Sequence, residues 1–250
     1  MATKKLRILW DNLLLGSTPT ASSEAADFPV EMLLNPWPKL GTQTTGVAAE
    51  WWKFDLGAGP DAATYFVLWG HNLGAAATIV LQAIDTDDWG APAVNQAVTR
   101  TADKLVVPIA ATRRWWRLTL ADAGNPDGYL GGGSAYLGPH FEFAYDFEKR
   151  APSFEDPSIV DHADDGMPSG QSKDAYRTLE YSFSAVSAAD YASLWTIWQT
   201  VRTGRPYTIV EDASDPSGTA YLVENVGGWR FGPIVNGWFT LSFTVREVPL

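Results

Sequence analysis

The sequence contains no cysteine, which excludes disulfide bonds, thiol nucleophiles and thiolate metal ligands. This absence fits a protein that folds in a reducing cytoplasm. Basic residues are also scarce, with 18 lysines and arginines against 29 aspartates and glutamates and a net charge of -11. A folded domain with this balance repels phosphate backbones, so we expect no nucleic-acid partner.

Long apolar stretches are missing as well. No run approaches the roughly 18 apolar residues that a membrane-spanning helix needs. The apolar stretch near the N-terminus is broken by Asp11 and Asn12, which leaves it too short for the apolar region of a signal peptide. We therefore expect a soluble protein without membrane insertion, which leaves the cell by lysis if it leaves at all.

Motifs that carry catalysis are absent. The 3 histidines, His71, His140 and His162, do not have the spacing of a zinc site, and no nucleophile elbow, Walker loop or dinucleotide fingerprint occurs. The glycine run 131–133 has no following lysine or helix and indicates a turn. We expect a non-enzymatic protein without cofactor or metal. A glycosidase remains an alternative, because its carboxylates are recognised in space and not in sequence.

Acidic loops at 85–90, 122–127 and 161–165 carry the oxygen atoms that calcium binds. The first has Trp89 at the fifth position of an EF-type loop and no bidentate glutamate to close it, and the second is likewise incomplete. We interpret all of them first as solvated polar turns.

Aromatic residues are abundant, with 12 Trp, 9 Tyr and 11 Phe. Large rings favour strands and fill sandwich cores, and they also serve as surface anchors. Short runs of strand character lie between clusters of Gly, Pro, Asn and Asp, which is typical of a β-sandwich or barrel. These runs are 6–10, 51–56, 63–70, 78–84, 104–109, 115–120 and 135–147.

The run around residue 117 alternates in the manner of a half-buried strand. One face would carry Arg113, Trp115, Arg117 and Thr119, and the other Trp116, Leu118 and Leu120. The second set is expected to pack in the core, while the first meets solvent or pairs with acids.

The segment 149–175 has a different composition. It contains several prolines, glycines and acidic residues and few large apolar residues. This composition indicates a linker or a long surface loop. We therefore expect one domain over 1–148 and a second, β-rich assembly domain over 176–250.

One helix is predicted, over about 188–203. Ser187 is its N-cap candidate, Gly204 suits the C′ position and Pro206 prevents continuation. Its apolar face comprises Tyr191, Leu194, Trp195, Trp198 and Val201. Strands are expected around it at 177–185, 207–212, 219–226 and 238–248, with a hairpin turn at 215–218. The fold class is thus mainly β, with an N-terminal sandwich and a smaller C-terminal antiparallel domain that carries one helix.

Four segments, in order, resemble the discoidin or galactose-binding-like β-sandwich. They are Trp51–Gly57, Trp69–Leu73, Arg114–Leu120 and Tyr136–Gly138. The resemblance spans about 6–147 and implies a jelly-roll sandwich in which His71 and Asn72 brace the turn after a strand. The disulfide of the family's extracellular members is absent.

The cysteine-free form is similar to modules of tailed-phage minor tail proteins, and the second domain loosely resembles domains of tail-tip and distal-tail proteins. This resemblance implies a structural component of a phage tail tip or baseplate, made in the host cytoplasm and located in the virion. Its implied partners are other tail proteins, further copies of itself as a trimer or hexamer, and a host-surface polysaccharide. A stand-alone carbohydrate-binding module and, less favoured, a polysaccharide hydrolase are the alternatives.

Candidate binding residues lie in the loops, because binding groups gather there on a rigid scaffold. Sugars stack on exposed aromatic rings beside planar polar side chains, so we select Trp37, Trp89, Asn125, Asp127 and Tyr129 as the glycan-binding set. Trp37 lies between two prolines, which lowers the ordering cost of binding. For subunit assembly we select Trp229, Phe231 and Trp238. Packing in a core remains the alternative role for these tryptophans and for Phe231.

Overall fold

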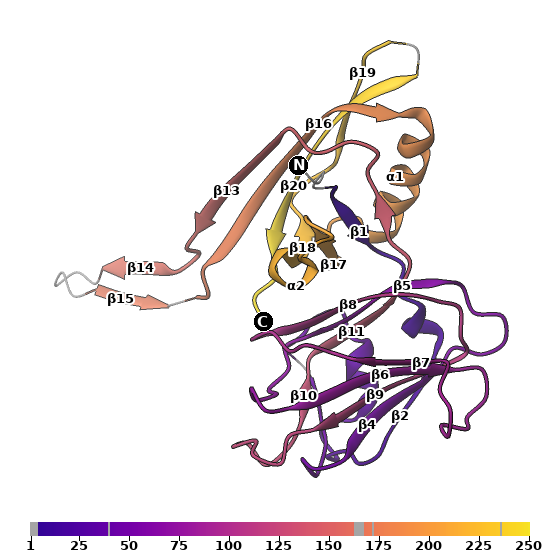
Figure 1. Cartoon of the computed structure of the whole chain (residues 1–250). Coiled ribbons are helices and arrows are strands. Elements are labelled where there is room, and N and C mark those ends of the chain that lie inside the picture. The colour runs from indigo at the N-terminus through magenta and orange to yellow at the C-terminus, as the bar shows by residue number, and fades with distance from the viewer. Residues whose placement is uncertain (1–4, 40, 163–167, 172, 236) are drawn as a thin grey trace. The chain divides into compact units, whose positions relative to one another are not determined.

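A computed structural model describes residues 5–39, 41–162, 168–171, 173–235 and 237–250, without the side chains of 149, 160–162, 168 and 169. The chain divides into two compact units (Figure 1). The sandwich unit comprises Arg7–Phe141, Val210–Ala220 and Leu250. The α1 unit comprises Met1–Leu6, Glu142–Ile209 and Tyr221–Pro249.

Two antiparallel sheets build the sandwich unit, with strand orders β2-β4-β9-β6-β7 and β11-β5-β8. The first contains β2 (Thr18–Ala21), β4 (Glu50–Asp55), β9 (Trp115–Ala121), β6 (Thr78–Ile84) and β7 (Val94–Ala97). The second contains β11 (Ser134–Gly138), β5 (Ala63–Trp69) and β8 (Lys104–Ala111). Smaller elements are the pair β3 (Thr42–Gln43) and β10 (Gly131–Gly132), the 3₁₀ helices Leu13–Gly16 and Val30–Leu34, β1 (Arg7–Leu9), β12 (Phe141–Glu142) and the short helix α2 (Pro216–Thr219).

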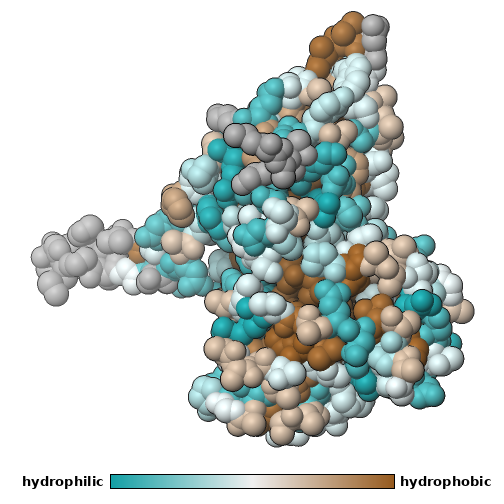
Figure 2. Space-filling view, viewed as in Figure 1, coloured by the Kyte–Doolittle hydropathy of each residue, from teal (hydrophilic) through white to brown (hydrophobic). Residues whose placement is uncertain are grey.

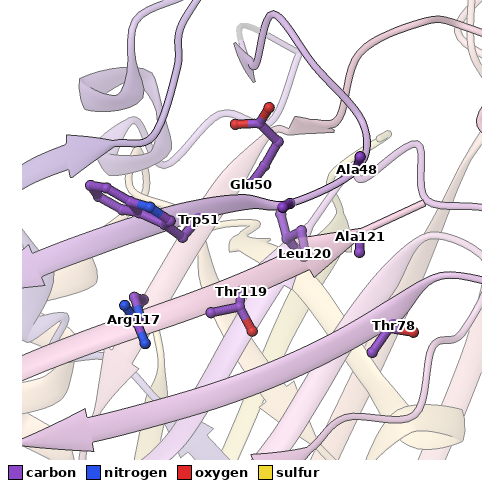
Figure 3. Close-up of a pocket in the computed structure, with 9 residues that line it drawn as sticks. Ala48, Glu50, Trp51, Thr78, Arg117, Thr119, Leu120 and Ala121 are labelled. Carbon is purple, nitrogen blue, oxygen red and sulfur yellow. The ribbon is translucent and has the colours of Figure 1, made fainter. Parts of the chain in front are cut away.

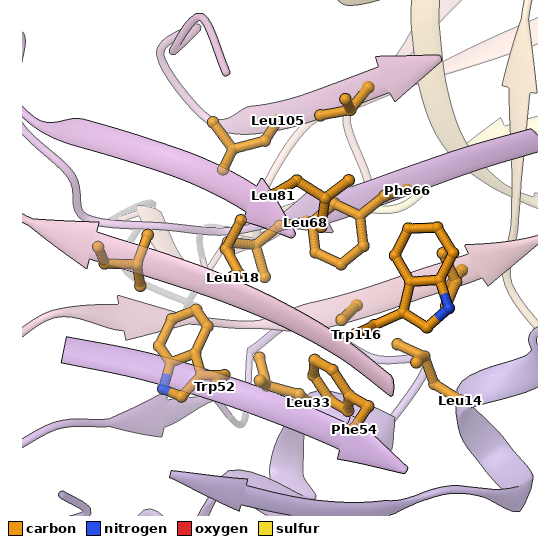
Figure 4. Close-up of a cluster of buried hydrophobic side chains, with 14 of the residues drawn as sticks. Leu14, Leu33, Trp52, Phe54, Phe66, Leu68, Leu81, Leu105, Trp116 and Leu118 are labelled. Carbon is orange, nitrogen blue, oxygen red and sulfur yellow. The ribbon is translucent and has the colours of Figure 1, made fainter. Parts of the chain in front are cut away.

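The core of this unit lies between the two sheets (Figure 4). Alternation in β4 and β9 turns every second side chain inward, so Trp52, Phe54, Trp116 and Leu118 are almost completely buried. Phe66 and Leu68 from β5, Leu105 from β8 and Leu81 from β6 belong to the same cluster. The remaining residues of β4 and β9 point to the outer face, as the alternation in the sequence predicts.

The α1 unit is built on antiparallel strands in the order β17-β18-β20-β16-β13, with β19 also paired to β20. Their bounds are β17 (Tyr207–Val210), β18 (Ala220–Asn225), β20 (Trp238–Glu247), β16 (Tyr176–Ser187), β13 (Lys149–Glu155) and β19 (Arg230–Pro233). Strands β14 (Ile159–His162) and β15 (Pro168–Gln171) form a separate antiparallel pair between β13 and β16 in the sequence (Figure 1). Rings from several strands pack together here, with Phe183 stacked on Phe143 at 4.0 Å.

Helix α1 (Ala188–Val201) begins where the sequence predicts, because the Ser187 hydroxyl accepts the backbone N–H of Asp190 at 3.1 Å. It ends two residues before the predicted 203, because Arg202 adopts a φ of 47°. It buries Leu194, Ile197 and Val201. No helix of the described residues is long and apolar enough to cross a membrane.

The predicted fold class, mainly β with a sandwich and a helix-bearing antiparallel domain, is confirmed by these sheets. The expected linker 149–175 differs from the structure, because β13 pairs with β16 and β14 pairs with β15 there. Pairing with a long neighbouring strand outweighs the low apolar content of this segment. Of the acidic loop 161–165, only the backbone of the first two residues is described.

Two smaller predictions are also corrected. The expected strand 135–147 is divided into β11 and β12, because Pro139 and His140 interrupt it, and residues 143–147 lie outside both strands. The expected hairpin turn 215–218 is the single-turn helix α2, in which the Asp215 carboxylate accepts the N–H of Gly218 at 3.0 Å.

Candidate binding site

A small open pocket of about 180 Å³, called here the loop pocket, lies beside the β3–β10 pair of the sandwich unit. Side chains that line it include Phe28, Lys39, Gln43, Asn72 and Tyr129. Backbone from the glycine run and from Gly70, just after β5, completes its wall. Segments far apart in the sequence therefore meet at this one place.

Asn72 fixes the geometry of the loop pocket. Its side-chain oxygen accepts the backbone N–H of Gly131 at 2.7 Å, while its amide donates to the Tyr129 carbonyl at 3.0 Å. The same amide donates to the Asp127 carboxylate at 2.9 Å. A single side chain thus holds the segment 127–131 against the chain that follows β5.

Asn125 and Asp127, two of the predicted glycan-binding residues, take part in hydrogen bonds that fix the conformation of this loop. Asn125 is buried and donates from its amide to the carbonyl of Asn72 at 2.9 Å. Its side-chain oxygen accepts the N–H of Asp127 at 3.0 Å. The structure therefore gives both residues structural contacts, while Tyr129 itself lines the pocket.

Glycine backbone makes the walls of the pocket close and rigid. A Cβ atom placed on Gly41 would lie only 2.4 Å from the Gly132 carbonyl oxygen. One placed on Gly133 would lie 2.4 Å from the carbonyl oxygen of Pro38. The two segments approach too closely for any side chain at these positions. The turn predicted for the glycine run is corrected, because Gly131 and Gly132 form β10 and pair with β3.

Two polar groups in the pocket wall are free to bind a ligand. The Gln43 amide and the Tyr129 hydroxyl make no hydrogen bond to any residue that the structure describes. Phe28 is 37% exposed in the same wall. Gln43 and Phe28 could not be predicted as site residues from the sequence, because neither lies in a recognisable motif.

Trp37 directly precedes two pocket-lining residues in the sequence. It is 41% exposed, and its backbone N–H donates to the Asn35 side chain at 3.0 Å. The following residues, Pro38 and Lys39, line the pocket. The Asn-Pro-Trp-Pro segment therefore exposes an aromatic ring directly before two residues of the pocket wall, in a conformation that the prolines restrict.

Trp89 lies elsewhere, next to the outer face of the five-stranded sheet. Its ring centre is 4.2 Å from the guanidinium carbon of Arg117, which indicates a cation–π contact. Its indole N–H donates to the Asp87 carboxylate at 2.7 Å. Trp89 thus belongs to a second group of residues and not to the loop pocket.

The three predicted assembly residues lie in the α1 unit. Trp229 stacks on Phe243 at 5.0 Å and donates its indole N–H to Asn225 at 2.9 Å. Phe231 packs edge-on against Tyr191 at 4.8 Å. Trp238 is 37% exposed, and its ring centre lies 6.0 Å from that of Tyr145. Of these residues, Trp238 is the most open to a partner.

The described residues contain no group of three or more His, Asp or Glu side chains arranged to hold a metal ion. Carboxylates of the 85–90 loop are engaged by cations, with Asp85 paired to Arg113 at 2.6 Å and Asp87 to Lys53 at 2.7 Å. The hydrogen bond from Lys53 lowers the pKa of Asp87. Burial lowers the pKa of His71, which keeps that imidazole neutral.

No protein-family model matches the chain. Among curated protein sequences there is no match either.

Solved structures of carbohydrate-binding modules are similar to about half of the chain. Chitosan-binding module 1 of a Paenibacillus sp. IK-5 chitosanase/glucanase is 23% identical, with a TM-score of 0.41, and the match covers 52% of this chain and 99% of that one. A Clostridium perfringens module in complex with GalNAc-β-1,3-galactose is 12% identical, with a TM-score of 0.43 and coverage of 52% and 100%. A Streptococcus pneumoniae fucose binding module is 11% identical, with a TM-score of 0.42 and coverage of 51% and 94%.

Proposed function

We propose that the sandwich unit binds carbohydrate without transforming it, and that the loop pocket is its binding site. The observation that carries this proposal is the pairing of aromatic rings with uncommitted polar groups in one rigid pocket. Tyr129 and Phe28 supply the rings, and Gln43 supplies an amide that both donates and accepts.

This combination suits a sugar for physical reasons. A pyranose has an apolar face of C–H groups, which packs on an aromatic ring, and a rim of hydroxyls, which needs hydrogen-bond partners. The pocket wall is held in place by Asn72 and by close glycine contacts, so little conformational entropy is lost on binding.

The test has two stages. A glycan array that includes bacterial surface polysaccharides first identifies ligands of the wild-type chain. Substitution of Tyr129 by Ala is then expected to weaken binding of those ligands at least tenfold, as measured by titration calorimetry. The matched control is Tyr145→Ala, which removes a tyrosine that is 52% exposed in the α1 unit.

Unchanged affinity in Tyr129→Ala, with the fold intact by circular dichroism, would contradict this location. Release of reducing ends from a bound polysaccharide would contradict a non-catalytic role.

Assembly with further copies of the chain, in a phage tail tip, is the second candidate function. The observation that favours it is the exposure of large apolar side chains on the α1 unit. Phe154 on β13 is 81% exposed, and Ile234 and Val235, in the turn after β19, are 51% and 62% exposed. Figure 2 shows apolar colour gathered at this turn between β19 and β20. Apolar groups presented in this way are typical of surfaces that a partner covers.

Mass photometry and sedimentation in dilute solution test this candidate. A trimer or hexamer is expected, and the double substitution Ile234→Ser with Val235→Ser is expected to dissociate it. Val226→Ser is the control, because Val226 is 48% exposed outside this turn. A wild-type chain that is monomeric at micromolar concentration would contradict self-assembly.

A further inference from the structure

The outer face of the five-stranded sheet carries a row of polar side chains that crosses neighbouring strands. The pairing register places Lys53 of β4 opposite Arg117 of β9, Arg117 opposite Gln82 of β6, and Gln82 opposite Asn95 of β7. Arg117 donates two hydrogen bonds to the Gln82 side-chain oxygen, at 2.9 and 2.7 Å. Gln82 in turn donates to Asn95 at 3.0 Å. The row is therefore ordered before any ligand arrives.

Tryptophan rings flank this row. The ammonium nitrogen of Lys53 lies 5.4 Å from the ring centre of Trp51 and 5.1 Å from that of Trp115. Trp89 covers the Arg117 guanidinium from the β6–β7 loop. The pairing register places Trp51 opposite Thr119, four residues from Trp115 along β9. The backbone positions of the two tryptophans are therefore about 13 Å apart along the strand direction. Both rings are half-buried, so each keeps part of its surface in contact with solvent.

An open pocket of about 320 Å³, the sheet-face pocket, lies on this surface (Figure 3). Its walls include Trp51, Thr78, Arg117, Thr119 and Glu50. Figure 3 shows these side chains arising from three adjacent strands. The pocket is larger than the loop pocket and shares no lining residue with it.

The charged groups of this surface balance in number, because Lys53 and Arg117 are cations and Asp87 and Glu50 are carboxylates. Lys53 pairs with Asp87 at 2.7 Å, and Glu50 accepts hydrogen bonds from the hydroxyls of Ser22 and Ser23. Arg117 has no ion pair with any described carboxylate and keeps N–H groups that are not used by Gln82. The face therefore offers planar hydrogen-bond donors beside an indole ring, without a strong net field.

We propose that this sheet face is a second carbohydrate-binding surface, which takes an extended, uncharged glycan chain across β4, β9 and β6. One sugar ring stacks on Trp51, and its hydroxyls accept hydrogen bonds from Arg117. The surface is open along the sheet and spans more than one sugar ring, which favours an internal stretch of a chain over a terminal sugar. The loop pocket, in contrast, accommodates a short end group.

Affinity electrophoresis tests this proposal with the full chain in gels that contain hydroxyethyl cellulose, xylan or galactomannan. At least one of these neutral polysaccharides is expected to retard the wild-type chain. Trp51→Ala is expected to weaken that retardation at least tenfold, whereas Tyr129→Ala in the loop pocket leaves it unchanged. The matched control is Trp195→Ala, which removes a tryptophan that is 45% exposed on α1.

A second variant keeps the test valid if Trp51→Ala unfolds. Thr119→Tyr fills the sheet-face pocket with a residue that strands favour, and it is expected to abolish retardation with the fold intact. The proposal is overturned if no neutral polysaccharide retards the chain, or if only an acidic one such as alginate does. Retardation that survives both variants also overturns it. Loss of retardation in Tyr129→Ala alone would instead assign all binding to the loop pocket.

Discussion

The side-chain oxygen of Asn72 accepts the backbone N–H of Gly131 at 2.7 Å, although the two residues are 59 positions apart. This hydrogen bond ties the end of β5 to the start of β10, where the loop pocket lies. Gly131 is buried, so no solvent replaces the bond if the side chain is removed.

Substitution of Asn72 by Ala is therefore expected to lower the free energy of unfolding by about 1–3 kcal/mol, the cost of leaving a buried donor unsatisfied. It is also expected to weaken glycan binding at the loop pocket, because Tyr129 loses the amide that holds its carbonyl. Urea denaturation measures the first effect and calorimetry the second. Thr203→Ala, at an exposed threonine whose side chain has no hydrogen bond to a described residue, is the control and should change stability by less than about 0.5 kcal/mol.

The Arg114 guanidinium donates two hydrogen bonds of 2.7 Å to the Asp55 carboxylate and holds the pKa of that group below its usual value. A carboxylate with a lowered pKa in the folded state adds stability above its unfolded pKa, about 3.9, and loses it as the pH falls through the folded value. Wild type is therefore expected to exceed Asp55→Asn in stability at pH 7, with the difference shrinking below about pH 4.

Urea midpoints measured at a series of pH values check this expectation. The control is Asp61→Asn, which alters an exposed carboxylate without a hydrogen bond to a described residue. A difference between wild type and Asp55→Asn that grows toward acid would contradict the assigned role of Arg114.

Strands with regular alternation could be predicted from the sequence, because burial on one face leaves a period of two. Residues 78–84 form β6 as predicted, and 115–120 lie within β9. Strands such as β7 and β13 were missed, since pairing with a neighbour defines them more than their own composition does. Pro152 in β13 made that segment resemble a linker, although proline is tolerated there because β13 ends the order of strands in its sheet.

The candidate site could be predicted only in part. Tyr129 lies in the loop pocket, and Trp37 immediately precedes residues that line it. Gln43 reaches the same place through the pairing of β3 with β10, a strand pair of two residues that leaves no periodic signal. Phe28 is held there by its carbonyl, which accepts the backbone N–H of Gln43 at 3.1 Å. Trp51 and Trp115 of the sheet face lie within predicted strands, but alternation alone does not distinguish a solvated face from a binding face.

Ser187 provides a test of the helix in the α1 unit. Its hydroxyl caps α1, so Ser187→Ala is expected to destabilise the chain by about 0.5–2 kcal/mol. Ser193→Ala is the matched control, because Ser193 lies on the exposed side of the same helix and bonds only to the Ala189 carbonyl. Equal effects of the two substitutions on the thermal midpoint would show that Ser187 does not act as a cap.

The end of α1 distinguishes the structure from the sequence-based expectation. The sequence predicts Gly204 as the residue with left-handed backbone, whereas the structure gives the positive φ, 47°, to Arg202. A residue with a Cβ is strained in that region and glycine is not, so Arg202→Gly is expected to stabilise the chain by about 1 kcal/mol. Gly204→Ala is expected to be nearly neutral, because no atom lies within 4 Å of the added Cβ. Denaturant midpoints of the two variants test which residue has the positive φ. If Gly204→Ala destabilised the chain and Arg202→Gly were neutral, Gly204 would be that residue, as the sequence predicts.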